Sequence, residues 1–133
     1  MRVMSRSDVQ DWLDRYVDAW RANEAGPIEA LFTEDVVYRW RPYESYPAAH
    51  GIAAVVGGWL DDTRDEPDTW EAKYEPFAVD GDRAVAIGFS RYFATDQEPE
   101  RTYHNVFLLR FVDDGRCSEF TELYMLEQPP DAT

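Results

Sequence analysis

Residues 108–124, LLRFVDDGRCSEFTELY, form two strand-like runs around a turn, and they decide how the predicted sheet is arranged. The DG pair at 114–115 is typical of a two-residue hairpin loop, and a four-residue loop around it gives the same pairing. Arg110 then lies opposite Glu119 as a favourable ion pair across the strands. A three-residue loop would mix apolar and polar residues on each face. The turn therefore predicts the register of the hairpin and places Glu122 on its apolar face.

A carboxylate on an apolar face raises the question of what it pairs with. The face carries, in alternation along the two strands, Asn105, Phe107, Leu109, Phe111, Phe120, Glu122 and Tyr124. In the preceding run, 83–95, Arg91 shares a row with Val85, Ile87, Phe89 and Phe93, which we expect to face inward. A buried charge is costly unless it is paired, hydrogen-bonded or beside a wet cavity. We therefore predict that Glu122 and Arg91 both point inward, where they either serve a site or form a core salt bridge that only sets strand register.

The remaining patterns predict one α+β domain over 1–133, with a core of about 7–127 and a flexible tail at 128–133. Apolar residues recur at helical spacing after a Ser7–Gln10 capping box. The expected elements, in order, are a helix over 8–22, a short helix opened by Pro27, a strand at 36–41, a helix over 51–61 and four antiparallel strands, with loops at 43–51 and 61–68.

Composition and charge exclude several classes of partner. The chain has 27 acidic and 13 basic residues, a formal net charge of −14, which repels nucleic acid and anionic membrane surfaces. No run approaches the roughly 20 apolar residues of a membrane span. A single cysteine cannot form an internal disulfide, and without a signal-like start the chain is expected to be cytoplasmic. Two histidines and one cysteine give no zinc ligand set, and no calcium loop is present, so we expect neither a metal nor a cofactor.

Aromatic residues make up 15% of the chain, including five tryptophans, which is rich for a small protein. Some of them are therefore expected to line a cavity that binds a small hydrophobic molecule. The alternative is that Tyr16, Trp20 and Trp40 are plain core residues. The predicted lining residues, which come from several elements, are Trp20, Tyr38, Trp40, Trp59, Phe89, Phe107 and Tyr124.

The order of elements and several short stretches resemble the nuclear transport factor 2-like superfamily, which includes SnoaL-like polyketide cyclases, ketosteroid isomerases and limonene epoxide hydrolases. These stretches, spread over about residues 7–127, are RYVDAW, ALFTEDVVY, HGIAAVV, VDGDRAVAIG and LLRFVDDGRCSEFTELY. The resemblance implies a cone-shaped, curved antiparallel sheet packed on three helices from the N-terminal half. It also implies a deep apolar pocket and frequent dimerisation through the outer face of the sheet.

Single residues match these families only in part. Ketosteroid isomerases have a tyrosine donor in the first helix, which Tyr16 matches, but their general-base aspartate falls on Trp40 here and their second acid falls near Phe107. Steroid isomerisation by that mechanism is therefore not implied. Arg91 with Glu122 resembles part of the arginine and acid set of limonene epoxide hydrolases, without a clear second inward acid. SnoaL-like cyclases use an acid on an inner strand as a base, for which Glu122 is the counterpart.

Three functions remain open at this point. In the first, Glu122 acts as general base or acid in chemistry of the cyclase, isomerase, dehydratase or hydrolase type, on an apolar substrate that contains a ring. Arg91, Tyr16 and Asn105 would then stabilise a developing oxyanion. In the second, the same groups only orient a ligand, and in the third the chain is an accessory dimer. In all three we expect a homodimer, because Val106, Leu108, Leu123 and Met125 form an apolar patch on the opposite face of the hairpin.

Overall fold

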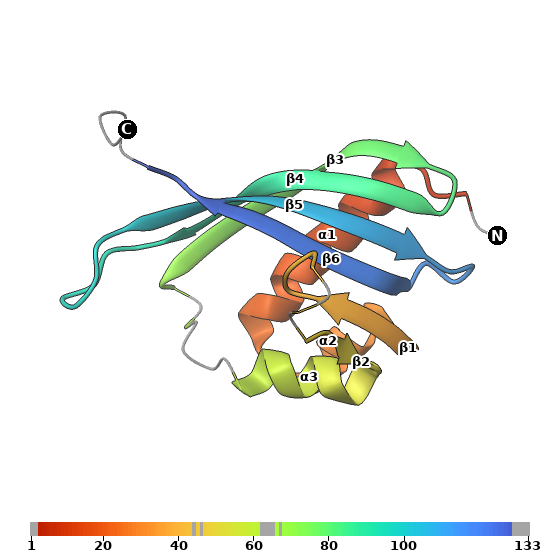
Figure 1. Cartoon of the computed structure of the whole chain (residues 1–133), viewed down its shortest axis with the longest axis horizontal. Helices are drawn as coiled ribbons and strands as arrows, with labels where there is room; N and C mark the ends of the chain where they lie inside the picture. Colours follow the sequence, from red (N-terminus) through yellow and green to blue (C-terminus); the bar gives the residue numbers. More distant parts are fainter. Residues whose placement is uncertain (1–2, 44, 46, 62–65, 67, 129–133) are drawn as a thin grey trace.

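The computed structural model describes residues 3–43, 45, 47–61, 66 and 68–128. Within them, the first half of the chain contains the three helices and two of the strands, and the second half contains the four long strands (Figure 1). The elements are α1 (Arg6–Ala22), α2 (Ala25–Glu29), β1 (Phe32–Arg39), β2 (Ala49–His50), α3 (Ile52–Asp61), β3 (Trp70–Asp80), β4 (Arg83–Tyr92), β5 (Arg101–Phe111) and β6 (Cys117–Leu126). Residues 129–133 of the predicted tail and most of the predicted acidic loop at 61–68 lie outside the described residues.

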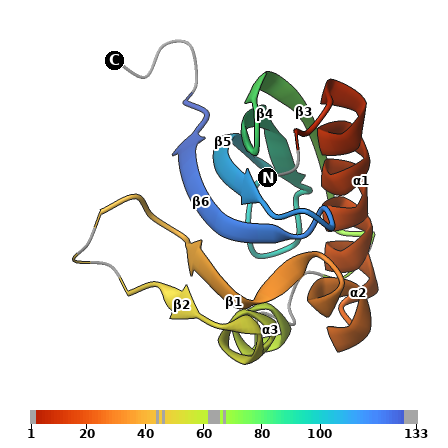
Figure 2. The same cartoon turned by 90° about the vertical axis from the view of Figure 1, so that its right-hand side faces the viewer.

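The described strands form one sheet in the order β2-β1-β6-β5-β4-β3. The sheet is mixed rather than wholly antiparallel, because β1 runs parallel to β6, with Tyr38 opposite Phe120. Part of the predicted loop at 43–51 pairs with β1 as the short strand β2. Figure 2 shows the sheet bending strongly, with α1 and α2 along one side of it and α3 against β1 and β2. This agrees with the predicted α+β architecture of a curved sheet packed on three helices.

The first helix begins earlier than its sequence pattern predicts. Ser5, rather than Ser7, is the N-cap: its hydroxyl accepts a hydrogen bond from the backbone of Asp8, and the Asp8 carboxylate accepts one from the backbone of Ser5. An aspartate at the third helical position completes a capping box as a glutamate would. The helix ends at Asn23, which has a left-handed φ of 52°. The buried face of α1, which packs into the core, is Val9, Trp12, Leu13, Tyr16 and Ala19.

The predicted register of the last hairpin is confirmed from Arg110 and Glu119 onward, whereas next to the turn it is shifted by one residue, with Phe111 opposite Cys117. Arg110 lies opposite Glu119, and Phe107 lies opposite Glu122. Phe107 and Phe120 are buried in the core, with 1% and 0% of their surfaces exposed, so their common face is the inner one. Glu122 belongs to this inner face.

The predicted facing of β4 is wrong. Residues opposite one another in an antiparallel pair share a face, and β4 pairs Ala86 with Phe107 on the inner face of β5. The small residues of β4 therefore point inward, and the row that contains Phe89 and Arg91 points outward. Arg91 pairs there with Glu71 of β3, at 2.8 Å from nitrogen to oxygen.

The physical reason for this facing is space. At Gly88 a Cβ atom would lie 2.1 Å from the carbonyl oxygen of Lys73 and 2.5 Å from the ring of Tyr74. Real Cβ atoms do not approach other atoms so closely, so the position excludes every larger residue. The ring of Tyr74 then packs on Phe107, with centroids 4.6 Å apart. Small residues on β4 thus leave room for large rings from the neighbouring strands.

Candidate functional site

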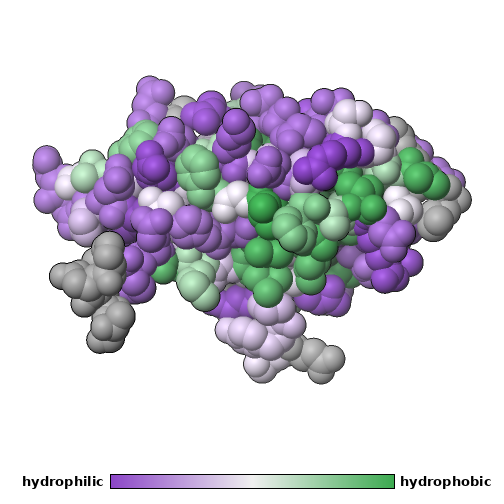
Figure 3. All heavy atoms as spheres, turned by 90° about the horizontal axis from the view of Figure 1, so that it is seen from above, coloured by the Kyte–Doolittle hydropathy of each residue, from purple (hydrophilic) through white to green (hydrophobic). Residues whose placement is uncertain are grey.

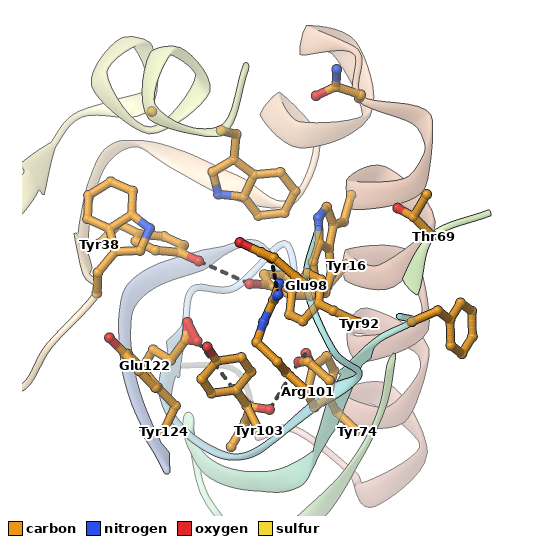
Figure 4. A pocket seen from close by; sticks show the side chains of 18 of the residues that line it. Tyr16, Tyr38, Thr69, Tyr74, Tyr92, Glu98, Arg101, Tyr103, Glu122 and Tyr124 are labelled. Atoms are coloured by element: carbon orange, nitrogen blue, oxygen red, sulfur yellow. Dashed lines mark hydrogen bonds and ion pairs between the residues drawn. The ribbon is translucent and has the colours of Figure 1, made fainter. Parts of the chain in front are cut away.

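A pocket of about 670 Å³ opens between the inner face of the sheet, the C-terminal half of α1 and the end of α3 (Figure 4). This volume lies within the range of about 300 to 1,000 Å³ that is usual for small-molecule sites. Its wall is mainly aromatic. The aromatic lining residues are Tyr16, Trp20, Tyr38, Trp40, Trp59, Tyr74, Tyr92, Phe93, Tyr103 and Tyr124. The others are Asn23, Gly58, Thr69, Ser90, Thr95, Glu98, Arg101, Asn105 and Glu122.

Glu122 is the carboxyl group of the pocket interior. Burial raises its pKa to about 7, and a hydrogen bond from Asn105 acts in the opposite direction. Asn105 Nδ2 donates that bond to Glu122 Oε1 over 3.3 Å. Among the described residues no lysine, arginine or histidine forms an ion pair with Glu122. The carboxyl therefore changes its charge near neutral pH, without a fixed counter-charge.

A chain of donors from three strands ends on this carboxylate. Ser90 Oγ donates to Asn105 Oδ1 over 3.0 Å, since a carbonyl oxygen can only accept. The single hydroxyl hydrogen of Ser90 is thereby used, so in the 2.5 Å contact with Tyr74 the tyrosine donates. The amide of Asn105 is held with its oxygen toward Ser90 and its nitrogen toward Glu122. The chain thus fixes Asn105 as a donor to the carboxylate.

Two further tyrosines face Glu122 from across the pocket. Their hydroxyl oxygens, those of Tyr16 on α1 and Tyr38 on β1, lie 3.0 Å apart. Burial raises the pKa of both hydroxyls well above the usual range, and the nearby Glu122 adds to the effect. Both stay protonated and act as neutral hydrogen-bond donors. Figure 4 shows Tyr16, Tyr38 and Glu122 pointing into the same region of the pocket.

Trp59 of α3 packs against this tyrosine pair, and the ring of Tyr16 is held edge-on to it, with centroids 5.1 Å apart. A phenol hydroxyl has one hydrogen to donate and can also accept. Whichever of Tyr16 and Tyr38 accepts in their mutual hydrogen bond therefore keeps its own hydrogen for another partner. The pair thus offers one hydrogen-bond donor to a bound molecule.

The charged groups at the mouth of the pocket are already paired. Arg101 forms an ion pair with Glu98, and its guanidinium lies 5.3 Å from the ring centroid of Tyr92. On the other side of the mouth, Arg41 donates to the hydroxyl of Tyr124 over 2.7 Å. Glu98 therefore neutralises Arg101, whereas the Tyr124 hydroxyl orients Arg41 without cancelling its charge.

Most of the predicted site residues gather around this pocket. Those that line it are Tyr16, Trp20, Tyr38, Trp40, Trp59, Asn105, Glu122 and Tyr124. Arg91 and Phe89 do not, because they lie on the outer face of β4, where the guanidinium of Arg91 is 5.6 Å from the Phe89 ring. Phe107 is buried behind the wall, against Tyr16 and Tyr74.

Several lining residues were not predicted from the sequence. Tyr74 and Ser90 supply the donor chain, while Tyr92, Tyr103 and Arg101 shape the outer part of the pocket. Their facing follows from the pairing of β3, β4 and β5 with one another. The sequence signal that could have placed Ser90 in the pocket is the row of small residues on β4 to which it belongs, because small residues fit a wall that packs against large rings.

Within the described residues, no group of three or more His, Cys, Asp or Glu side chains is placed to hold a metal ion. None of the described helices combines the length and the apolar character needed to cross a membrane.

Structural comparison finds the same fold in proteins of low sequence identity. A protein of unknown function with a cystatin-like fold from Methylobium petroleophilum PM1 superposes with a TM-score of 0.66 at 16% identity, covering 98% of this chain and 84% of that one. An LEH-like epoxide hydrolase of M. tuberculosis gives 0.64 at 11% identity, covering 90% and 84%. An NTF2-like protein from Burkholderia xenovorans LB400 gives 0.63 at 17% identity, covering 92% of both chains.

Sequence comparison shows the family. No curated protein matches this sequence. The model of the SnoaL-like domain, however, matches residues 13–120, which is most of the chain. The match begins inside α1, before Tyr16, and ends in β6 just before Glu122. The chain therefore belongs to the family of SnoaL-like domains, in the nuclear transport factor 2-like superfamily.

Proposed function

We propose that this protein catalyses proton transfer on a small molecule that contains a ring, with Glu122 as the general base or acid. The observation that carries the proposal is the Glu122 carboxyl itself. It faces an aromatic pocket, its pKa is raised to about 7 by burial, and a fixed amide holds one of its oxygens. General acid–base catalysis is most effective when the pKa of the catalytic group lies near the working pH.

The groups around the carboxyl suit the two ends of such a reaction. Glu122 takes a proton from a substrate carbon next to a carbonyl group, and the electron pair left behind moves onto the carbonyl oxygen. The pair of Tyr16 and Tyr38, which keeps one hydroxyl hydrogen outside its mutual hydrogen bond, donates a hydrogen bond to that oxygen. Hydrogen bonds to a developing oxyanion in a water-poor site stabilise the transition state more than the ground state. The protonated Glu122 then returns its proton to another atom of the product.

The donor chain gives the base a defined position. Asn105 binds Oε1 of the carboxylate, and Oε2 has no hydrogen bond from the described part of the chain, so Oε2 is the oxygen available to substrate. Because Asn105 stabilises the ionised form, it offsets part of the effect of burial. Asn105 is therefore proposed as a positioning residue rather than as an oxyanion donor.

Hydrogen–deuterium exchange on a model ketone tests the proposal without knowledge of the natural substrate. The α-protons of 2-tetralone, a two-ring ketone, are followed by proton NMR in D₂O with and without the protein. We expect the protein to accelerate exchange, and Glu122→Gln to reduce the acceleration by about 10² or more while the thermal unfolding curve stays cooperative. Exchange no faster than in buffer, or equal rates for both proteins, would refute a proton-transfer role.

We also propose that two copies pair through the outer face of the sheet. Figure 3 shows apolar side chains gathered on this face, with hydrophilic ones around them. On β5 and β6, Leu108 and Met125 expose 44% and 73% of their surfaces on this face. Exposed apolar patches of this kind usually mark interfaces, and a second copy of the sheet would cover it.

A further inference from the structure

We propose that the ligand of this pocket is a ring compound carrying a positively charged nitrogen, which binds against the aromatic wall with its charge directed at Glu122. This inference names the ligand class of the site described above, and so it rests on the proposed function for its biological meaning. The binding argument itself depends only on charge, burial and geometry.

The first argument is the missing counter-charge. The described arginines near the pocket have partners elsewhere: Arg101 pairs with Glu98 at the mouth, and Arg91 pairs with Glu71 on the outer face of the sheet. No basic group contributes to the pKa shift of Glu122, whose causes are burial and the Asn105 amide. A buried carboxylate without a cation is unfavourable. A ligand that brings its own positive charge relieves this cost, and a neutral ligand does not.

The second argument is the wall. Ten of the nineteen described lining residues are aromatic, and nine of these ten are tyrosine or tryptophan. The faces of such rings carry partial negative charge and attract cations that have been stripped of water. The protein already uses this interaction at the edge of the pocket, where Arg101 lies over Tyr92 at 5.3 Å and Arg41 lies over Tyr124 at 5.5 Å. A ligand cation in the interior would meet the same kind of surface with less competing water.

The third argument weighs the opposite ligand. The arginine among the described lining residues is Arg101, and Glu98 already neutralises it. Arg41, bound to the Tyr124 hydroxyl at the mouth, is not among the lining residues. Deeper in the pocket an anion would be repelled by Glu122. The net charge of −14 adds a long-range field that attracts cations and repels anions. Charge near and far from the pocket therefore favours a cation.

Three compounds that share a ring system separate these possibilities. They are 1-naphthylmethylammonium, 1-naphthalenemethanol and the carboxylate 1-naphthaleneacetate, which carry a positive charge, no charge and a negative charge, respectively. Their binding is measured by isothermal titration calorimetry at pH 8, where Glu122 is ionised and the aliphatic ammonium is still charged. We expect the ammonium compound to bind about tenfold more tightly than the alcohol, and the acetate to bind most weakly.

Two variants assign the effect to Glu122. Glu122→Gln should remove most of the advantage of the ammonium compound and leave the affinity of the alcohol unchanged. Glu119→Gln is the matched control, because Glu119 lies on the same strand, is exposed, and faces Arg110 at 3.8 Å instead of the pocket. It removes the same charge from the whole protein and should keep the preference for the ammonium compound.

Several results would overturn the inference. They are equal binding of the ammonium compound and the alcohol by the parent protein, tighter binding of the acetate, no binding of any of the three at millimolar concentration, or an equal loss in both variants. The first three are measured on the parent protein, so the inference stays testable even if Glu122→Gln folds poorly. Failure here would leave deuterium exchange on the neutral ketone unaffected, which separates an error about the ligand from an error about catalysis.

Discussion

Glu122→Gln should change how the stability of this protein depends on pH. Burial raises the pKa of Glu122 from 4.5 to about 7. Between these values the folded protein keeps a proton that the unfolded chain has lost. Because the unfolded state then binds fewer protons, the free energy of unfolding falls as pH rises through this window. Each pKa unit corresponds to about 1.4 kcal/mol, so the free energy of unfolding falls by about 3 kcal/mol between pH 4 and pH 8.

Glutamine keeps the shape of the side chain and can accept the same hydrogen bond from Asn105, but it does not titrate. Urea unfolding at pH 5 and pH 8 should therefore show the parent losing about 2 to 3 kcal/mol more than Glu122→Gln between the two conditions. Glu119→Gln serves as the control for the change in net charge, and it should behave like the parent. Parallel pH dependence of the parent and Glu122→Gln would show that Glu122 is not buried as described, and would refute the reasoning.

Three further predictions test the donor chain, the outer face and the close approach of β3 to β4. Asn105→Ala should raise the pKa of Glu122 further, by about one unit, because a hydrogen bond to a charged group is worth about 1.5 kcal/mol or more. Carbon-13 NMR of the Glu122 carboxyl carbon measures this pKa, and an unchanged value would contradict Asn105 as the donor. Leu108→Glu should produce monomers in sedimentation velocity, whereas the same change at Phe77, exposed on edge strand β3, should not; a monomeric parent would refute the dimer. Gly88→Ala should lower the free energy of unfolding by about 2 kcal/mol or more in urea titrations, because the new Cβ would lie 2.1 Å from the backbone oxygen of Lys73. A variant as stable as the parent would mean that β3 can move aside.

The parts of the fold that could be predicted depend on local signals. The last hairpin is the clearest case, since the ion pair between Arg110 and Glu119 selects its pairing. The turn alone would not have done so, because Phe111 lies opposite Cys117 next to it and an irregularity between Arg110 and Phe111 restores the predicted register. The inward direction of Glu122 follows from this pairing alone. Helix α1 was predicted from its apolar spacing, and only its cap was displaced, because either Ser5 or Ser7 could start the helix and the choice depends on Asp8.

The facing of β4 could not be read from its own residues. Its two rows are both largely apolar, and the bulkier row looks like the core row when taken alone. The link between β4 and β5, residues 93–100, is too long to set a register as a tight turn does. What decides the facing is the volume of neighbouring side chains, above all Tyr74 and Phe107, which leave room only for the small row.

Tyr74 was missed for a related reason. The turn between β3 and β4 pairs Asp80 with Arg83, and simple counting from it would put Tyr74 opposite Phe89 on the outer face. A β-bulge between Pro76 and Ala78 shifts the register by one residue, so Tyr74 lies opposite Gly88 and faces inward. A bulge reverses the facing of every residue beyond it. Without it the donor chain to Glu122 would have no first member.

The structure also changes how the charge at Glu122 is to be understood. A salt bridge with Arg91 would have explained an inward carboxylate as a device that sets strand register, and its removal would then have cost about 3 to 5 kcal/mol. Arg91 lies on the other face with Glu71, so that explanation fails. Ionisation of Glu122 instead destabilises the folded protein as pH rises from about 4.5 to about 7. The stability of the fold therefore gives no reason for a carboxylate at this position. Transfer of a proton or binding of a cation would give such a reason. Deuterium exchange that depends on Glu122 supports proton transfer. A preference for the ammonium compound that depends on Glu122 supports cation binding.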